Sequence, residues 1–217
     1  MIILQRKDTT KMTPTKSQAK IIWLETAEST NKTLRESIPT SDNLSVIAAR
    51  EQTAGRGQGA HTWFSSPGKN LTFSMLYKPE RLNVDEMIVI TCATTLGIRD
   101  YLLEKGVEAR IKWPNDIWVG DKKICGILIE NILDGSFIRD SIIGIGFNLN
   151  EDKWPEDLPN PVSLHNLTGK EYSTDAELVL LTNKICRRFA QAGSYDGRLS
   201  LQEEFGEYLF RLEQEAA

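Results

Sequence analysis

The residues best suited to chemistry lie in a glycine-rich stretch from Gln52 to Asn70, which holds four glycines, one arginine and one tryptophan. Gly55, Gly57 and Gly59 lack a Cβ, so backbone N–H groups beside them can approach an anionic ligand closely. Arg56 lies between the first two, and its guanidinium is a charged fork suited to a phosphate or a carboxylate. Short glycine motifs are weak evidence alone, and a surface loop with a chance arginine explains them equally well.

A second stretch, Lys112 to Glu130, contains the leading catalytic candidate. Residues 110–112 are predicted to end a strand at Pro114, and residues 117–119 and 124–133 are predicted to form a hairpin. A lysine at the last position of a strand, beside a turn, can point into a cleft. Lys112 is therefore the side chain that we expect to supply positive charge to a reaction.

The elements that must position these residues are predicted from hydrophobic periodicity and capping signals. Further strands are expected at 20–24, 44–50, 71–77 and 141–143. Helices are expected after the capping residues Ser29, Thr30 and Asn31, at 84–105, at 174–192 and at 199–213. Thr174 and Glu177 have the spacing of a capping box at the start of the third helix.

Composition limits the possible functions. The 217 residues are 40% hydrophobic and 26% charged, which is typical of one soluble globular domain. The net charge of −4 argues against a non-specific nucleic-acid binder. We found no signal peptide and no membrane span in the sequence, so we expect a cytoplasmic protein. Three well-separated cysteines in apolar segments predict buried free thiols, and two histidines offer little material for a metal site.

Together, the two stretches resemble the biotin protein ligases, enzymes that join biotin to a lysine of a carrier protein using ATP. The resemblance extends from about Ile21 to Leu212. It rests on AGRGQ at 54–58, Trp63, PGKNLTFSM at 67–75, KWPNDI at 112–117, KKICGILIE at 122–130 and IIGIGFNLN at 142–150. The fold that it implies is α/β (α+β), with a mixed, largely antiparallel sheet flanked by helices, like that of class II aminoacyl-tRNA synthetases.

The resemblance also implies roles for individual residues. Ser29, Thr30 and Asn31 would line the biotin pocket, although a plain helix cap explains the same three residues. The biotin and adenylate site would further include Gln52, Arg56, Gly57 and Gln58, with Trp63 as part of a lid over biotin and nucleotide. Lys112 and Asn148 would contact the nucleotide; a core role for Trp63 and a turn role for Asn148 are the alternatives. Gln58 departs from the family, whose members commonly carry a second arginine there.

The activity implied by the resemblance has two steps. Biotin and Mg-ATP would form biotinyl-5'-AMP, with Lys112 and Arg56 as catalytic residues, and the biotinyl group would pass to the carrier protein of a biotin-dependent carboxylase. ATP, Mg2+ and biotin are the expected small-molecule partners; no nucleic acid, membrane or protein-bound metal is expected, and the chain would be a monomer or homodimer. Lipoate protein ligase and a non-catalytic protein that binds biotin or biotinyl-AMP are the alternatives.

The same resemblance predicts the domain organisation. Residues 1–19 would form a polar arm and residues 20–213 the catalytic domain. We expect no winged-helix domain before Ser29, and we expect the small C-terminal β-barrel of the family to be absent or truncated.

Overall fold

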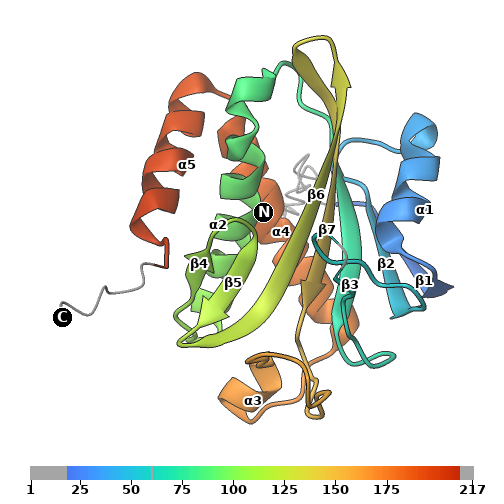
Figure 1. Ribbon diagram of the computed structural model, residues 1–217. Helices are drawn as coiled ribbons and strands as arrows, with labels where there is room; N and C mark the ends of the chain where they lie inside the picture. The colour runs from blue at the N-terminus through green and yellow to red at the C-terminus, as the bar shows by residue number, and fades with distance from the viewer. Residues whose placement is uncertain (1–18, 60, 211–217) are drawn as a thin grey trace, which may run out of the picture.

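The computed structural model describes residues 19–59 and 61–210, and these form one mixed sheet of seven strands in the order β1-β2-β3-β7-β6-β5-β4 (Figure 1). Strands β1 and β2 are parallel, and every other neighbouring pair is antiparallel. The strands are β1 (Ile21–Ala27), β2 (Val46–Gln52), β3 (Leu71–Tyr77), β4 (Arg110–Lys112), β5 (Asp116–Val119), β6 (Lys122–Asp134) and β7 (Phe137–Phe147). The predicted mixed, largely antiparallel sheet is confirmed.

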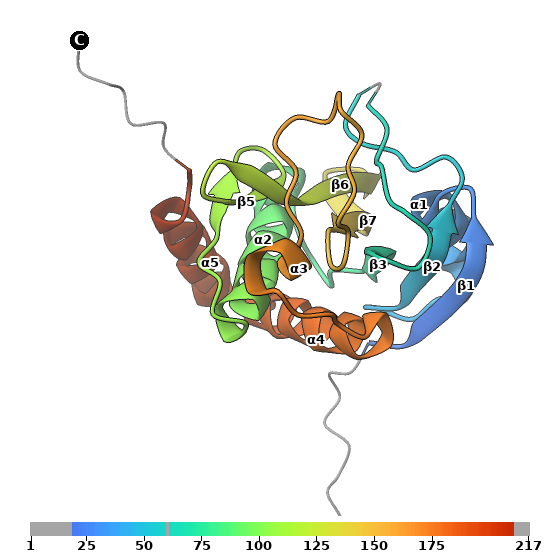
Figure 2. The same ribbon diagram turned by 90° about the horizontal axis from the view of Figure 1, so that it is seen from below.

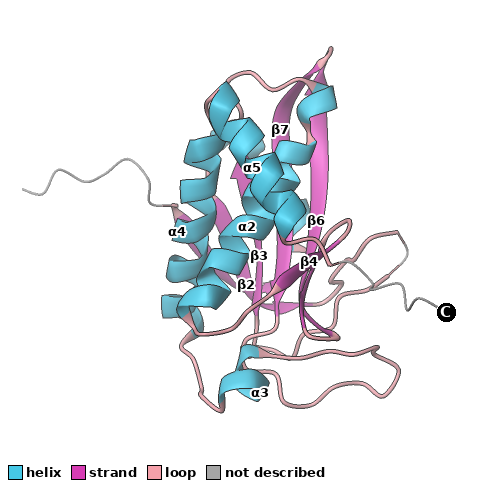
Figure 3. Cartoon of the chain, turned by 90° about the vertical axis from the view of Figure 1, so that its left-hand side faces the viewer, coloured by secondary structure: helices cyan, strands magenta, loops and turns pink. Residues whose placement is uncertain are grey.

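Helices cover the two faces of the sheet unequally. Helices α2 (Ile88–Glu104), α4 (Thr174–Ala192) and α5 (Tyr195–Glu207) form a layer on one face, as Figure 3 shows. Helix α1 (Thr30–Ser37) lies on the opposite face, which we call the α1 face. Short helix α3 (Leu164–Thr168) follows the sheet, and 3-10 turns occur at Ile38–Thr40 and Val84–Glu86. No helix in the described ranges is long and apolar enough to cross a membrane.

The two faces of the sheet have separate hydrophobic cores. On β3, Phe73 and Met75 join the large core beneath α2 and α4, where Ile90 and Ile185 are also fully buried. On the α1 face, a small core gathers Leu34, Ile47, Leu76 and Ile142. Because strand side chains alternate between faces, Ser74 is directed to the same face as Leu76. The strand predicted at 71–77 is therefore confirmed.

Some element boundaries differ from the predictions. Strand β7 runs through Gly144 to Phe147, so the apolar run is longer than residues 141–143. The predicted capping box at Thr174 is wrong, since Ser173 is the N-cap and accepts a hydrogen bond from Ala176 N. Glu177 instead accepts from the Tyr101 hydroxyl at 2.7 Å. The last helix begins at Tyr195 and ends at Glu207. Residues 1–18 of the predicted arm and residues 211–213 lie outside the described residues.

Candidate active site

A cavity of about 600 Å³ opens on the α1 face of the sheet. The loop residues 53–59, 61–70 and 151–162 project over this face (Figure 2), and several of them line the cavity. Its lining includes all ten residues that the sequence suggested: Ser29, Thr30, Asn31, Gln52, Arg56, Gly57, Gln58, Trp63, Lys112 and Asn148. These residues come from six separate segments of the chain, so the fold brings together what the sequence spreads over 120 positions (Ser29 to Asn148). Their roles stay predictions.

One end of the cavity is a connected set of polar side chains, Thr30, Asn31, Gln52 and Ser74. Gln52 Oε1 accepts from Thr30 N at 2.8 Å and from Thr30 Oγ1 at 3.1 Å. Ser74 Oγ lies 2.7 Å from Thr30 Oγ1 and 2.5 Å from Asn31 Oδ1, and its single proton can serve one of them at a time. These four side chains, called the polar floor below, hold one another in fixed orientations.

The polar floor leaves defined groups for a ligand. Because Thr30 occupies Gln52 Oε1, the amide group left to face the cavity is Gln52 Nε2, a donor. Ser29 is the N-cap of α1, as the capping interpretation predicts, but its side chain makes no capping hydrogen bond. Its hydroxyl can therefore donate to or accept from a ligand. The floor and the Ser29 hydroxyl together offer both kinds of hydrogen-bonding group, as a buried neutral polar ring requires.

The glycine loop is a small hairpin closed by its own backbone. Gly57 N donates to His61 O at 2.8 Å, and Trp63 N donates to Gly55 O at 3.0 Å. Arg56 and Thr62 form a bridge between these two bonds. The Gly57 amide, which the sequence suggested for an anionic ligand, is therefore engaged within the loop. The hairpin instead serves to position the side chains of Arg56 and Trp63.

Trp63 rests in a slot made by two glycines that face each other across β6 and β7. Gly126 and Gly146 are partners in the strand register. A Cβ on Gly126 would lie 2.7 Å from Trp63 Cζ3, and one on Gly146 would overlap the indole at Cε2 and Nε1. Only glycine permits this approach. The indole Nε1 is buried and has no hydrogen-bond partner in the described residues, so the slot holds the ring by packing alone.

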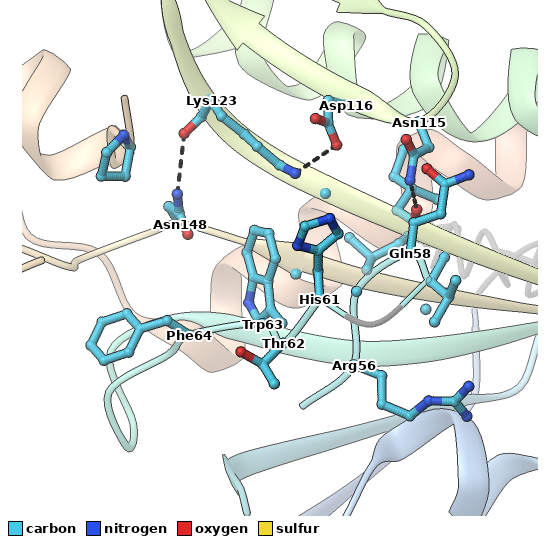
Figure 4. Close-up of a pocket in the computed structure, with 18 of the residues that line it drawn as sticks. Arg56, Gln58, His61, Thr62, Trp63, Phe64, Asn115, Asp116, Lys123 and Asn148 are labelled. Carbon is cyan, nitrogen blue, oxygen red and sulfur yellow. Dashed lines mark hydrogen bonds and ion pairs between the residues drawn. The ribbon is translucent and has the colours of Figure 1, made fainter. Parts of the chain in front are cut away.

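Lys123 and Asp116 were missed by the sequence reasoning. Lys123 Nζ lies 2.7 Å from Asp116 Oδ1 and 5.5 Å from the centroid of the Trp63 ring, as Figure 4 illustrates. Strict alternation would place Lys123 on the same face as Cys125, which belongs to the helical core. A β-bulge between β5 and β6 adds Ile124 as an extra residue and directs Lys123 into the cavity. A bulge leaves no clear mark in a sequence.

The two predicted catalytic cations lie at the edge of the cavity. Lys112 Nζ stacks 3.8 Å from the centroid of the Trp118 ring. The Arg56 side chain extends away from Trp63 (Figure 4), and its NH1 atom lies 3.8 Å from Glu130 Oε1. Lys123 is thus the cation nearest the glycine slot, while Lys112 and Arg56 can approach it only through side-chain rotation.

The end of the cavity opposite the polar floor is built around Asn148. Its Nδ2 donates to Val162 O at 3.0 Å and to Lys123 O at 3.3 Å, which fixes the amide orientation. Asn148 Oδ1 is buried and lacks a partner among the described residues. Aromatic rings that the sequence reasoning did not select, Phe64 and Trp154, lie nearby with centroids 6.5 Å apart. This end is suited to a flat ring that carries a donor.

Comparisons with known proteins agree with this geometry. Residues 23–148 match the model of the Biotin/lipoate A/B protein ligase family. The chain is 30% identical over 175 residues to the biotin--[acetyl-CoA-carboxylase] ligase of Paracoccus denitrificans, covering 77% of this chain and 72% of that protein. It is 31% identical over 156 residues to the bifunctional ligase/repressor BirA of Bacillus spizizenii, covering 70% of this chain.

The chain spans 48% of the length of that bifunctional relative. Among solved structures, the biotin protein ligase of Aquifex aeolicus in complex with biotin and ATP superposes with a TM-score of 0.72. It shares 26% identity with this chain, and the match covers 89% of this chain and 79% of that one.

Proposed function

Because the chain belongs to the biotin/lipoate A/B protein ligase family, we propose that it joins biotin to a lysine of a biotin carboxyl carrier protein through biotinyl-5'-AMP. Relatives carry the name of this activity, and one solved relative holds biotin and ATP. The proposal assigns the cavity on the α1 face as the site of both steps, and it places the reaction in the cytoplasm. Three free, buried cysteines agree with a reducing compartment.

The observation that carries the proposal is the order of groups along β7. Gly144 lies against Asn31 of the polar floor, Gly146 forms the slot, and Asn148 follows at the other end. Residues 144 to 148 span about 13 Å of extended chain, with every second position on one face. A biotinyl adenylate has the same order of parts: a neutral cyclic urea, an acyl phosphate and an adenine.

Each end matches the chemistry of its proposed occupant. A ureido ring needs donors for its oxygen and acceptors for its N–H groups, and Ser29, Thr30, Asn31 and Gln52 provide both. The buried Asn148 Oδ1 would accept from the exocyclic amine of adenine, which would satisfy an otherwise costly orphan acceptor. Trp63 has to leave the slot before a ligand can occupy it, and it can then pack over the ligand as a lid.

In the first step, the biotin carboxylate attacks the α-phosphorus of ATP and pyrophosphate leaves. Two anions meet, so the site has to supply positive charge where negative charge develops. Lys123 lies at the slot, and we propose that it acts with Lys112 and Arg56 to stabilise the transferring phosphoryl group. One such group is typically worth about 3 to 4 kcal/mol of barrier. In the second step, the carrier lysine attacks the acyl carbon and AMP leaves.

Mg2+ enters this proposal with ATP. No cluster of three His, Cys, Asp or Glu residues that could hold a metal ion occurs in the described part of the chain. Mg2+ commonly relies on substrate phosphates together with one or two carboxylates. The roles proposed here for the protein belong to its own side chains.

Two alternatives make different predictions. A lipoate ligase would need an apolar wall for the dithiolane ring, whereas the floor here is polar. A non-catalytic biotin-binding protein would not need Lys112, Lys123 and Arg56 at one cavity. The polar floor and the three cations together favour biotin activation.

The test is acid-dependent exchange of labelled pyrophosphate into ATP. We expect exchange with biotin, and none with lipoate or without an acid. Transfer to a carrier domain would then be followed separately with preformed biotinyl-5'-AMP. Exchange with lipoate alone would support the lipoate alternative, and tight biotin binding without any exchange would support the non-catalytic one.

A further inference from the structure

Glu130, near the end of the cavity formed by the polar floor, contacts three groups from two segments, helix α1 and the glycine loop. Its Oε2 accepts from Asn31 Nδ2 at 2.8 Å. Its Oε1 lies 3.4 Å from Arg35 NH2 on α1 and 3.8 Å from Arg56 NH1 in the glycine loop. Glu130 follows Gly126 and Leu128 on the α1 face of β6, and its side chain is 22% exposed.

The ion pair between Glu130 and Arg56 is easy to exchange. The Arg56 side chain is 59% exposed, and 3.8 Å is near the limit for an ion pair. Pairs of this kind contribute little to stability because water and salt screen them. Arg35 contacts the same carboxylate oxygen at the shorter distance of 3.4 Å. When Arg56 leaves, Glu130 therefore keeps one cation and one amide donor, so no buried charge is left without a partner.

We propose that Glu130 is a positioning residue that holds the Arg56 guanidinium at the edge of the cavity, directed away from Trp63, until the anionic end of the acid substrate replaces Glu130 as the partner of Arg56. This inference rests on the proposed function, because the incoming anion is the carboxylate of biotin. In the ligand-free protein, the Glu130 carboxylate competes with that anion for the Arg56 guanidinium. Arg35 and Asn31 retain Glu130 after the exchange.

Glu130 also fixes the amide of Asn31. A carboxylate accepts only, so Asn31 Nδ2 has to face Glu130, and Asn31 Oδ1 then faces Ser74. A purely structural role for Glu130 would act through this contact and would influence the ureido end of the ligand. The proposed role acts through Arg56 and influences the charged end. The two roles can therefore be separated by a ligand that lacks the charge.

The experiment compares the dissociation constants of biotin and of its neutral amide, biotinamide, for the wild-type protein and Glu130→Gln. Glutamine keeps an acceptor for Asn31 and removes the charge. The measured quantity is the dissociation constant of biotinamide divided by that of biotin. We expect this ratio to be about two- to fivefold higher for Glu130→Gln than for the wild-type protein. In an Arg56→Gln background the same substitution should leave this ratio unchanged, because the competing group is gone.

Glu36→Gln is the matched control, since it removes one negative charge from an exposed position of α1 and should leave the ratio as in the wild type. An unchanged ratio in Glu130→Gln would overturn the inference, as would an equal change in the Arg56→Gln background. Failure of the wild-type protein to bind either ligand would instead overturn the proposed function.

Discussion

Lys123 and Lys112 both lie at the cavity, and we expect both to contribute to adenylation although their surroundings differ. Lys123 pairs with Asp116 beside the slot, whereas Lys112 stacks on the ring of Trp118. We expect Lys123→Ala to slow pyrophosphate exchange by about 10² to 10³ at saturating biotin. We expect Lys112→Ala also to lower the rate of exchange more than it weakens biotin binding. Both effects are measured as kcat against the biotin dissociation constant.

Lys122→Ala, which changes the exposed neighbour of Lys123, is the control and should exchange normally. A Lys112→Ala protein that binds biotin poorly but exchanges at the full rate when saturated would remove Lys112 from the chemistry. If Lys123→Ala gave the same result as well, Arg56 would be the remaining candidate among the three cations.

The glycine slot allows a second test at the level of single atoms. Gly146→Ala would place a methyl group inside the volume of the Trp63 indole, so the ring has to leave the slot. Overpacking of this kind costs about 1 to 3 kcal/mol of unfolding free energy. The control is Gly206→Ala on α5, where a Cβ meets nothing within 4 Å and helix propensity favours alanine. In urea unfolding, Gly146→Ala should therefore lower the free energy of unfolding, and Gly206→Ala should raise it.

At the scale of elements, the sequence predicted regular strands and helices well and local irregularities poorly. The alternation of β3 and the apolar stripe of α4 are direct consequences of packing against the large core, so their periods are visible in the residues. Lys123 depends on a bulge, and Glu130 depends on a contact between β6 and two distant arginines. Neither has a local signal. The resemblance located the ten site residues, but the hydrogen-bonded hairpin at Gly57 required the structure.

The start of α4 gives a prediction at this scale. Ser173 Oγ accepts from Ala176 N, while the Thr174 hydroxyl accepts from Arg50 on β2. Ser173→Ala should therefore lower the unfolding free energy by about 1 kcal/mol, the usual value of an N-cap. Ser173→Asp keeps a capping oxygen and should restore the lost stability. Equal loss in the alanine and aspartate variants, measured by urea unfolding, would show that Ser173 does not cap α4.

At the scale of the molecule, unequal covering of the sheet makes room for the site. Three helices cover one face, and the large core beneath them supplies most of the buried apolar side chains. Within the described residues, the α1 face carries one eight-residue helix and a core of four buried residues. The remaining area is left to glycines and polar groups, which a packed core would not tolerate. Stability and ligand binding are thereby assigned to opposite faces.

The large core also contains the three cysteines, which predict how the whole fold responds to alkali. Burial raises the pKa of Cys92 to about 12 and that of Cys186 to about 11, from an ordinary value of 9.0, and it raises the pKa of Cys125 as well. Above about pH 9 the unfolded chain loses thiol protons that the native protein keeps. Because the native state then binds more protons, the unfolding free energy falls as pH rises.

Each thiol that is ionised only in the unfolded chain contributes up to about 1.4 kcal/mol of lost stability per pH unit. Urea unfolding under reducing conditions should therefore give a constant free energy between about pH 7 and 8 and a steep decline between about pH 9 and 10. Cys186→Ala should make that decline shallower, because it removes one of the three thiols that ionise in the unfolded chain and stay protonated in the native protein. An identical slope in the variant and the wild type would show that other groups cause the alkaline loss of stability. The first to consider are Tyr77 and Tyr101, because burial raises their pKa values as well.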